Sequence, residues 1–210
     1  VHYEVLLTHV HLDHWMGLPF FAPLYEARNT FTFYGRARDG LGVEDALCSL
    51  MRAPWFPVAL SSTPSTKRFV DLGDAPLDFG VLRVTHAELR HPGGVTAFRL
   101  EGPALSVVAA TDCERGDPAA DARLAALGRG ADLLVHDAQY TPDEYEHHRG
   151  WGHSTWAHAI EAARSMNARR LLLFHHDPWR TDEELDRIVA DARRLFPEVA
   201  AAADAMTLPW

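Results

Sequence analysis

The chain has 210 residues, of which 47% are hydrophobic, so it is long enough to bury a substantial core, and we expect a single domain over residues 1–210. Its 29 acidic and 20 basic residues give a net charge of −9 with the histidines neutral. This charge disfavours a nucleic acid as a bulk partner, because phosphate binding usually needs a basic surface. No apolar run approaches the roughly 20 residues of a membrane helix, so we expect no membrane partner.

The cysteine and histidine counts indicate the cellular setting and the kind of chemistry to expect. Two cysteines are too few for a disulfide framework, and no signal peptide is visible, so we expect a reducing, cytoplasmic setting. Thirteen histidines shift the expectation towards metal or proton chemistry. The chain opens at Val1 inside an apparent strand and without a methionine, which suggests that upstream sequence is missing.

The first expected element is a strand over residues 1–7, and it leads directly into a segment rich in metal ligands. His9 and His11 are two residues apart, so an extended backbone directs both side chains to the same side. A turn after them brings Asp13 and His14 towards a second point close by. Imidazole nitrogen and carboxylate oxygen are ligands for zinc, iron and manganese. The pattern therefore predicts two metals at the end of a strand, whereas the simpler interpretation is a histidine-rich surface turn.

The segment T-H-V-H-L-D-H resembles the HxHxDH signature of the metallo-β-lactamase superfamily of hydrolases. The resemblance implies an α/β fold, the αββα metallo-β-lactamase sandwich, with a binuclear metal site at the sheet edges. The two divalent ions implied are zinc, with manganese or iron as alternatives. The superfamily usually has several strands before its signature, so we expect this chain to lack the N-terminal strands of the sandwich.

The next elements are read from periodicity and from proline and glycine. They are a short helix over 18–27 interrupted by two prolines, a strand over 30–34, a helix over 43–52, an irregular loop over 54–64, and strands over 68–72, 77–85, 95–100 and 104–110. The sequential order and short turns of these last four strands predict an antiparallel section.

Beyond residue 115, strands and helices alternate, which predicts a sheet covered by helices. The expected helices cover 118–127, 155–166 and 182–196, and the expected strands cover 133–136 and 171–174. Thr181 and Glu184 form a capping-box pattern at the start of the last helix. Ligands of such sheets collect beyond the strand ends, and each remaining candidate residue lies at such an end.

Three of these candidates complete the ligand set that the superfamily resemblance implies. His91 lies in the loop before the strand 95–100, with His86 as its competitor; Asp112 follows the strand 104–110; and His175, rather than His176, ends the strand 171–174. One ion is then bound by His9, His11 and His91 and the other by Asp13, His14 and His175, with Asp112 bridging them. A turn histidine at 91 and a capping aspartate at 112 are the simpler alternatives.

Two further segments resemble the tRNA 3′-processing endonucleases of the same superfamily. L-V-H-D-A-Q resembles their L-V-H-E-A-T stretch, and G-H-S-T resembles their histidine before a helix. The resemblance implies that Asp137 orients His153, which contacts a phosphoryl oxygen or protonates the leaving alkoxide as a general acid. The simpler interpretation is a strand-end cap at Asp137 and a helix-start residue at His153.

These patterns predict a binuclear metal-dependent phosphodiesterase with a metal-bridging hydroxide as nucleophile and with Asp13, Asp137 and His153 as its catalytic residues. The expected partner is a small phosphoester substrate, such as a cyclic nucleotide or a nucleic-acid end. A thioester or lactone hydrolase on the same site and a non-catalytic metal-binding scaffold are the alternatives. The tRNA-processing activity itself is disfavoured, since no inserted basic arm is visible, and a homodimer is left open.

Overall fold

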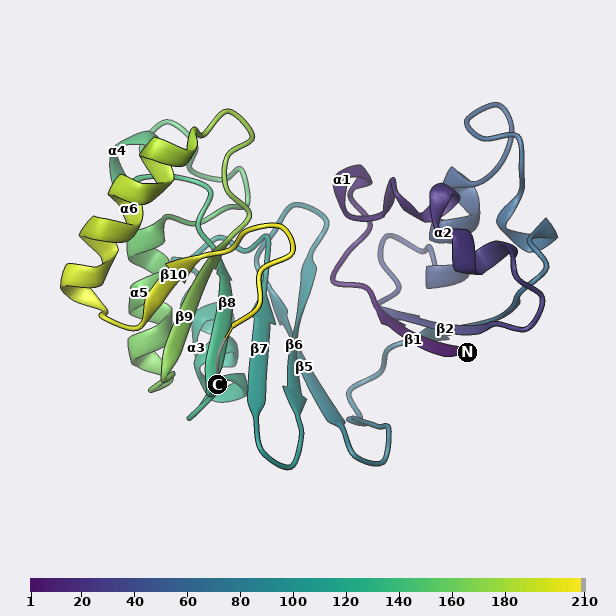
Figure 1. The fold of residues 1–210 in the computed structure, drawn as a ribbon, viewed down its shortest axis with the longest axis horizontal. Coiled ribbons are helices and arrows are strands. Elements are labelled where there is room, and N and C mark those ends of the chain that lie inside the picture. The colour runs from purple at the N-terminus through teal and green to yellow at the C-terminus, as the bar shows by residue number, and fades with distance from the viewer. Residues whose placement is uncertain (209–210) are drawn as a thin grey trace. The chain divides into compact units, whose positions relative to one another are not determined.

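The computed structural model describes residues 1–208 and divides into two compact units, Val1–Ala75 and a second unit that begins at Pro76. Each unit contains one β-sheet, of three strands in the first unit and seven in the second. The strands and helices of both units are labelled in Figure 1. The single domain expected from the sequence stays a prediction.

The first unit is built on a parallel sheet in the order β1-β2-β3. Its strands are β1 (His2–Leu6), β2 (Thr30–Gly35) and β3 (Thr66–Asp71). Helix α2 (Val43–Leu50) crosses over between β2 and β3, as a parallel connection requires. The core contains Phe31 and Phe33, whose rings stack 5.8 Å apart at the centre of the sheet. The prediction that the strand near 68–72 opens an antiparallel section is therefore wrong, because this crossover makes β3 parallel to β2.

Short helices connect these strands. The region expected to form one helix over 18–27 contains two 3₁₀ helices, η1 (Leu18–Phe20) and η2 (Ala22–Tyr25). Pro19 and Pro23 lack the backbone N–H that a continuous α-helix would need, which explains the division. The other short helices of this unit are α1 (Leu12–Trp15) and η3 (Leu60–Ser62).

The second unit is a seven-stranded sheet in the order β10-β9-β8-β7-β6-β5-β4. Its strands are β4 (Leu77–Asp78), β5 (Arg83–Leu89), β6 (Val95–Glu101), β7 (Ser106–Ala110), β8 (Leu133–Asp137), β9 (Arg170–Phe174) and β10 (Val199–Ala201). Strands β4 to β7 pair antiparallel, as predicted, and β7 to β10 pair parallel. The predicted strand 77–85 is two strands, because a turn at Gly80 (φ +80°) interrupts it and places His86 within β5.

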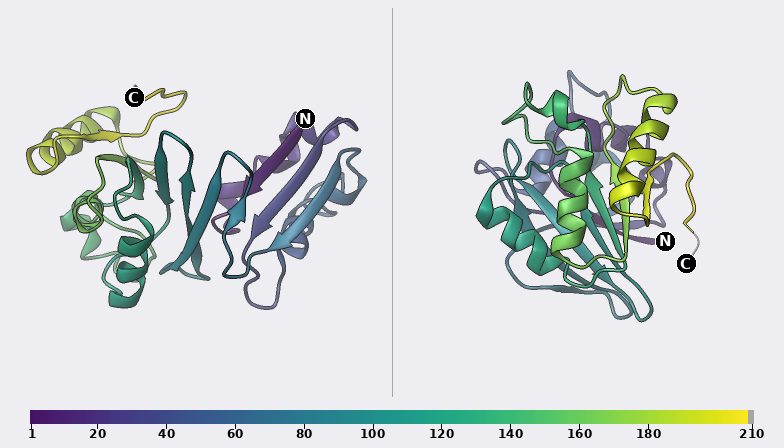
Figure 2. Two further views of the ribbon diagram at one scale, coloured as in Figure 1. Left: turned by 90° about the horizontal axis from the view of Figure 1, so that it is seen from below. Right: turned by 90° about the vertical axis from the view of Figure 1, so that its left-hand side faces the viewer.

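Helices α3 (Pro118–Leu127), α5 (Trp156–Ser165) and α6 (Asp182–Leu195) cover this sheet, and Figure 2 (right) shows them beside one another. Thr181 and Glu184 form the predicted capping box of α6. Helix α4 (Pro142–Tyr145) and strand β10 were not predicted, since each is too short to show a periodic pattern.

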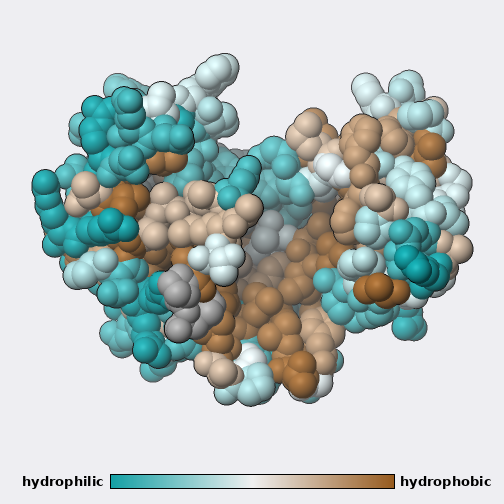
Figure 3. Space-filling view, viewed as in Figure 1, coloured by the Kyte–Doolittle hydropathy of each residue, from teal (hydrophilic) through white to brown (hydrophobic). Residues whose placement is uncertain are grey.

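The two faces of the second sheet differ in their packing. Val108, Ala110 and Leu134 are fully buried in the core that includes α3 and α5. Their strand neighbours Val107 and Ala109 point to the opposite face and are partly buried. Figure 3 shows hydrophobic residues gathered over these strands. Within the described part of the chain, no helix combines the length and the apolar character needed to cross a membrane.

Candidate active site

The histidine-rich segment of the first unit folds back on itself directly after β1. The ring of His9, which is buried, lies 4.6 Å from that of His11 and 4.3 Å from that of His14, measured between centroids. Helix α1 supplies the turn, since the backbone N–H of His14 donates to the carbonyl of His11 at 3.1 Å. The carboxylate of Asp13 lies 3.4 Å from His14 Nε2. The four ligand-type side chains of the motif therefore lie together in this unit.

In the second unit, parallel strands β7, β8 and β9 bring their carboxyl ends to one edge of the sheet, where Asp112, Asp137 and His175 lie. His175 Nε2 is 3.2 Å from a carboxylate oxygen of Asp112, which is 1% exposed. Both residues have left-handed backbones, with φ of +54° at Asp112 and +56° at His175. Such strained conformations persist where the surroundings fix them, and they cluster at functional sites.

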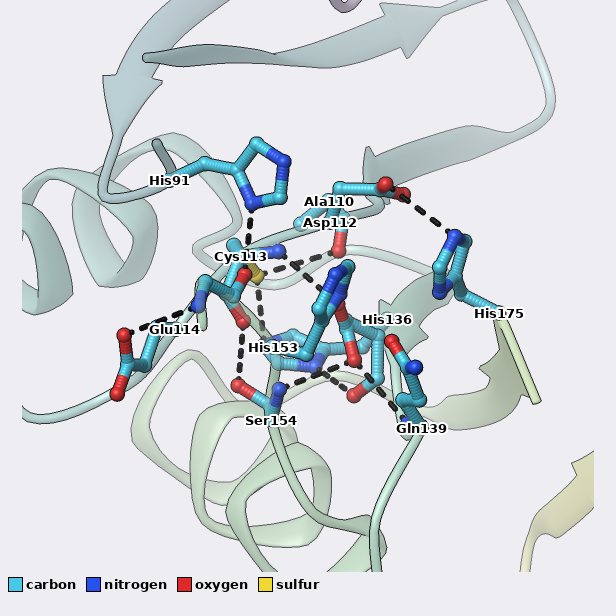
Figure 4. Close-up of polar contacts among 12 residues, drawn as sticks. His91, Ala110, Asp112, Cys113, Glu114, His136, Gln139, His153, Ser154 and His175 are labelled. Carbon is cyan, nitrogen blue, oxygen red and sulfur yellow. Dashed lines mark hydrogen bonds and ion pairs between the residues drawn. The ribbon is translucent and has the colours of Figure 1, made fainter. Parts of the chain in front are cut away.

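His91 and His153 complete a cluster of ligand-type atoms at this edge. One ligand atom each of His91, Asp112 and His153 lie within 4.8 Å of one another, and the same holds for Asp137, His153 and His175. The ring of His153 stacks on that of His175 at 4.8 Å and lies 5.1 Å from that of His91. Figure 4 shows His153 between these two histidines.

Asp137 is a fully buried carboxylate that fixes His153. One of its oxygens accepts from His153 Nδ1 at 2.8 Å and from the Cys113 backbone N–H at 3.1 Å, and the other accepts from the backbone N–H groups of Gln139 and Ser154 at 3.1 and 3.0 Å. Burial raises the pKa of Asp137, and the hydrogen bond from His153 opposes that rise. With the proton of its neutral form on Nδ1, His153 keeps its lone pair on Nε2.

His136 precedes Asp137 on β8 and lies on the helix-covered face, as expected from strand alternation. It is fully buried, and this burial lowers its pKa to about 4, so it is neutral near pH 7. Its Nδ1 donates to the backbone carbonyl of Asp137 at 2.7 Å, and the thiol of Cys113 lies 3.6 Å from Nε2. These contacts give His136 a packing role.

The loop before His153 holds His91 from the side. His91 Nδ1 donates to the backbone carbonyl of Gly152 at 2.8 Å. Gly152 has φ +94°, and a Cβ at this position would lie 2.2 Å from Pro92 Cδ and 2.4 Å from His91 Nδ1. Only glycine fits so close an approach, so the backbone of residue 152 is in direct contact with the turn that carries His91.

Replacing Gly152 with alanine should destabilise the protein by roughly 3–5 kcal/mol, the sum of a strained positive φ and an overpacked contact. Urea unfolding of the metal-free protein measures this loss. Gly150→Ala is the matched control, because Gly150 also has a positive φ, +87°, yet nothing lies within 4 Å of an added Cβ. The control should cost only about 1–2 kcal/mol. Equal losses in the two variants would contradict the close approach at residue 152.

The loop after His175 is held by an ion pair with α4. Both terminal nitrogens of Arg180 donate to the carboxylate of Glu144, at 2.9 and 2.7 Å, and Arg180 also donates to the backbone carbonyl of Gln139 at 3.2 Å. The hydrogen bond from Arg180 is the main reason that the pKa of Glu144 is lowered to about 2. The pair therefore connects the loops that follow β8 and β9, which carry the site.

This pair predicts a pH-dependent contribution to stability. Because the folded-state pKa of Glu144 lies below its ordinary value of 4.5, the contribution is present above about pH 4.5 and is lost as the pH falls towards 2. Glu144→Gln should cost on the order of 1 kcal/mol at pH 7, since the Glu144 side chain is 40% exposed. Urea midpoints of the two proteins should converge as the pH falls from about 4.5 towards 2, and a difference independent of pH would contradict this expectation.

The structure brings the predicted candidates together within each unit. His9, His11, Asp13 and His14 form one group in the first unit, and His91, Asp112, Asp137, His153 and His175 form another in the second. His86, the competitor of His91, lies in β5 with its ring 6.2 Å from that of Phe98 and belongs to no such group among the described residues. Sequence reasoning missed Gly152 and the buried Glu114, whose contacts no local pattern reveals.

Known proteins resemble this chain in sequence. The profile of the Beta-lactamase superfamily domain matches residues 3–176. The chain is 32% identical over 179 residues to a ribonuclease Z of Bradyrhizobium sp. (strain ORS 278) and 38% identical over 107 residues to one of Ignicoccus hospitalis. These matches cover 84% and 51% of this chain but only 54% and 33% of the two relatives, so the chain spans about half of their length or less.

Solved structures show the same fold. The metallo-β-lactamase fold protein YhfI from Bacillus subtilis matches with a TM-score of 0.70 and 23% identity, over 95% of this chain and 73% of that one. The short form of human tRNase Z matches with a TM-score of 0.71 and 20% identity, over 99% and 79%. The predicted α/β fold class and the resemblance to the tRNA-processing branch are thereby confirmed. The chain belongs to the Beta-lactamase superfamily domain family, whose metallo-β-lactamase fold implies divalent metal ions.

Proposed function

We propose that the chain is a binuclear metal-dependent hydrolase, and specifically a phosphodiesterase that cleaves a small phosphate ester. The observation that carries the proposal is the pair of Asp137 and His153, which share a 2.8 Å hydrogen bond within the cluster of His91, Asp112 and His175. Hydrolysis of a phosphoester needs a group that stabilises the charge on phosphorus and protonates the leaving alkoxide, and an oriented imidazole provides both.

The donor atoms fit a pair of divalent cations. The first unit offers three imidazoles and a carboxylate within six residues, and the second offers His91 and His175 around the buried carboxylate of Asp112. Imidazole and carboxylate ligands suit zinc, with manganese or iron as alternatives. In this proposal the two units act as one domain: His9, His11 and His91 would hold one ion, Asp13, His14 and His175 would hold the other, and Asp112 would serve both. When bound, such a pair lowers the pKa of water and offsets phosphoryl charge.

The protein groups then have separate tasks. Asp137 holds His153 as the Nδ1–H tautomer, because its carboxylate can only accept. His153 Nε2 contacts a phosphoryl oxygen in its neutral form, or delivers a proton to the leaving oxygen in its protonated form. Asp112 is buried and His175 is partly buried, and their fixed left-handed backbones keep these ligands in place without rearrangement.

The substrate proposed is a small phosphoester, such as a cyclic nucleotide or the end of a nucleic acid. The relatives named ribonuclease Z support a nucleotide phosphodiester, since their name states that they cleave RNA. The net charge of −9 disfavours extended contact with a polyanion. Both cysteines are free, which suits a reducing compartment such as the cytoplasm.

The test measures hydrolysis of bis(p-nitrophenyl) phosphate by the purified chain with zinc or manganese. We expect turnover with at least one metal, and a fall in kcat of roughly 10²–10⁴-fold in His153→Ala with the metal content unchanged. His147→Ala, an exposed histidine in the same segment, is the control and should stay within about twofold of the wild type. If neither metal supports turnover while a thioester or lactone is hydrolysed, the phosphoester assignment is wrong.

A further inference from the structure

Glu114 lies two residues after Asp112 and is a buried carboxylate that neither the family signature nor the proposed chemistry uses. It is 4% exposed, so its charge is buried. Burying a carboxylate costs free energy unless several hydrogen-bond donors surround it. The groups that donate to Glu114 therefore indicate its role. These groups come from three separate segments of the second unit.

The contacts of Glu114 converge on the turn before His153. Oε1 accepts from the Tyr145 hydroxyl at 2.9 Å and from the Gly150 backbone N–H at 2.7 Å, and Oε2 accepts from the Gly152 backbone N–H at 3.2 Å. The guanidinium of Arg90, beside His91, lies 3.7 Å from Oε2. One side chain thus fastens both ends of the 150–152 turn.

That turn in turn fixes the candidate ligand His91. The Gly152 carbonyl can only accept, so its 2.8 Å contact places the proton of neutral His91 on Nδ1 and leaves Nε2 as the metal-binding nitrogen. The missing Cβ of Gly152 lets the backbone approach the ring, as the 2.4 Å distance from a hypothetical Cβ to Nδ1 shows. Glycine itself adopts many backbone conformations, so residue 152 does not fix this approach, whereas the hydrogen bond from its N–H to Glu114 does.

We propose that Glu114 is a positioning residue for the metal site: its carboxylate holds the 150–152 turn, and through the Gly152 carbonyl it sets the tautomer and orientation of His91. The proposal rests on the metal role proposed for His91. Groups behind a ligand histidine commonly determine ring orientation and metal affinity. The same turn directly precedes His153, so Glu114 also helps to position His153 for its hydrogen bond with Asp137.

Glu114→Gln separates this role from simple packing, because the side chain keeps its size. A glutamine has one acceptor oxygen and one NH₂ donor in place of the two carboxylate oxygens. Its NH₂ group must therefore face either the N–H of Gly152 or the N–H of Gly150 and the hydroxyl of Tyr145, which then lose their acceptor. In metal-free protein, ¹H–¹⁵N spectra of the histidine rings should show His91 Nδ1–H exchanging with solvent at least tenfold faster and both tautomers present. Affinity for zinc, measured by competition with a chelator, should fall roughly 10–100-fold.

Two further variants complete the experiment. Glu146→Gln removes an exposed carboxylate in the same segment, paired with Arg149 at 2.6 Å, and should leave the His91 signals and the zinc affinity within about twofold of the wild type. Glu114→Asp keeps the charge but shortens the reach, so its exchange rate and affinity should fall between those of wild type and Glu114→Gln. If Glu114→Gln does not fold, the aspartate variant decides, with at least threefold faster exchange expected.

The proposal is overturned if Glu114→Gln keeps His91 as a single Nδ1–H tautomer and its zinc affinity stays within twofold of the wild type. If only Glu114→Asp folds, the same result in that variant overturns it. Either outcome holds whatever the change in melting temperature. Because the ring spectra need neither substrate nor metal, this outcome is distinct from failure of the phosphodiesterase assignment.

Discussion

Asp137→Asn should lower kcat for a phosphodiester by roughly 10²–10⁴-fold while the chain still binds its metals. The aspartate accepts four hydrogen bonds, two on each oxygen, and one of them comes from His153 Nδ1. An asparagine has only one acceptor oxygen, so either His153 and Cys113 or Gln139 and Ser154 lose their acceptor. Backbone N–H groups cannot turn, and the Gln139 and Ser154 side carries two of the three. We therefore expect the asparagine NH₂ to face His153 and Cys113 and to force the proton of His153 onto Nε2.

The measurement is steady-state turnover of bis(p-nitrophenyl) phosphate across pH, with metal content determined on the same samples. Asp132→Asn is the control, because Asp132 also accepts from a backbone N–H, that of Ser106 at 2.9 Å, but directly precedes β8, at the end of the strand away from the cluster. It should lower stability without lowering kcat more than about twofold. A value of kcat for Asp137→Asn within fivefold of the wild type would show that Asp137 does not orient the acid.

Asp112→Asn should reduce the bound metal to about one ion per chain or fewer and reduce activity on the order of 10³-fold, because the charge of a bound metal supplies several kcal/mol of transition-state stabilisation. Asparagine tolerates the left-handed backbone that Asp112 adopts at φ +54°, so the variant removes charge without adding strain. The carboxylate is 1% exposed and 3.2 Å from His175, so the variant removes a buried charge beside a second candidate ligand.

Metal content by elemental analysis and turnover with added zinc together check this expectation. Asp39→Asn is the matched control, since Asp39 is also left-handed, with φ +50°, but is exposed in the first unit. It should retain full metal content and activity. Retention of two ions and full activity by Asp112→Asn would remove Asp112 from the ligand set.

The strand-end positions of the candidate site were predictable because they depend on backbone geometry alone. Alternation along an extended segment directs His9 and His11 to one side, and parallel strands that end together bring Asp112, Asp137 and His175 to one edge. The start of α6 was predictable for a similar reason, since Thr181 and Glu184 encode it locally. Each of these features is specified within a few residues of sequence or by the regular geometry of a sheet.

The features that sequence reasoning missed depend on contacts between distant segments. Glu114 meets the N–H of Gly152 38 residues further along, and no periodicity encodes that meeting. The parallel pairing of β3 with β2 was missed because α2 between them was read only as a helix and not as a crossover. Pro19 and Pro23 divide the 18–25 region into two 3₁₀ helices. Both prolines are visible in the sequence, but the sequence alone did not decide whether they interrupt one α-helix or produce two 3₁₀ helices.

Anomalous diffraction from crystals of the chain grown with zinc tests whether the signature motif and the second-unit cluster bind one pair of ions. We expect two peaks, one about 2.0–2.2 Å from His91 Nε2 and the other at that distance from His175, with Asp112 within bonding reach of both. His9 and His11 should bind the first ion, and Asp13 and His14 the second. Peaks found only away from Asp112, or none at either histidine, would contradict the proposed metal centre and the hydrolysis derived from it.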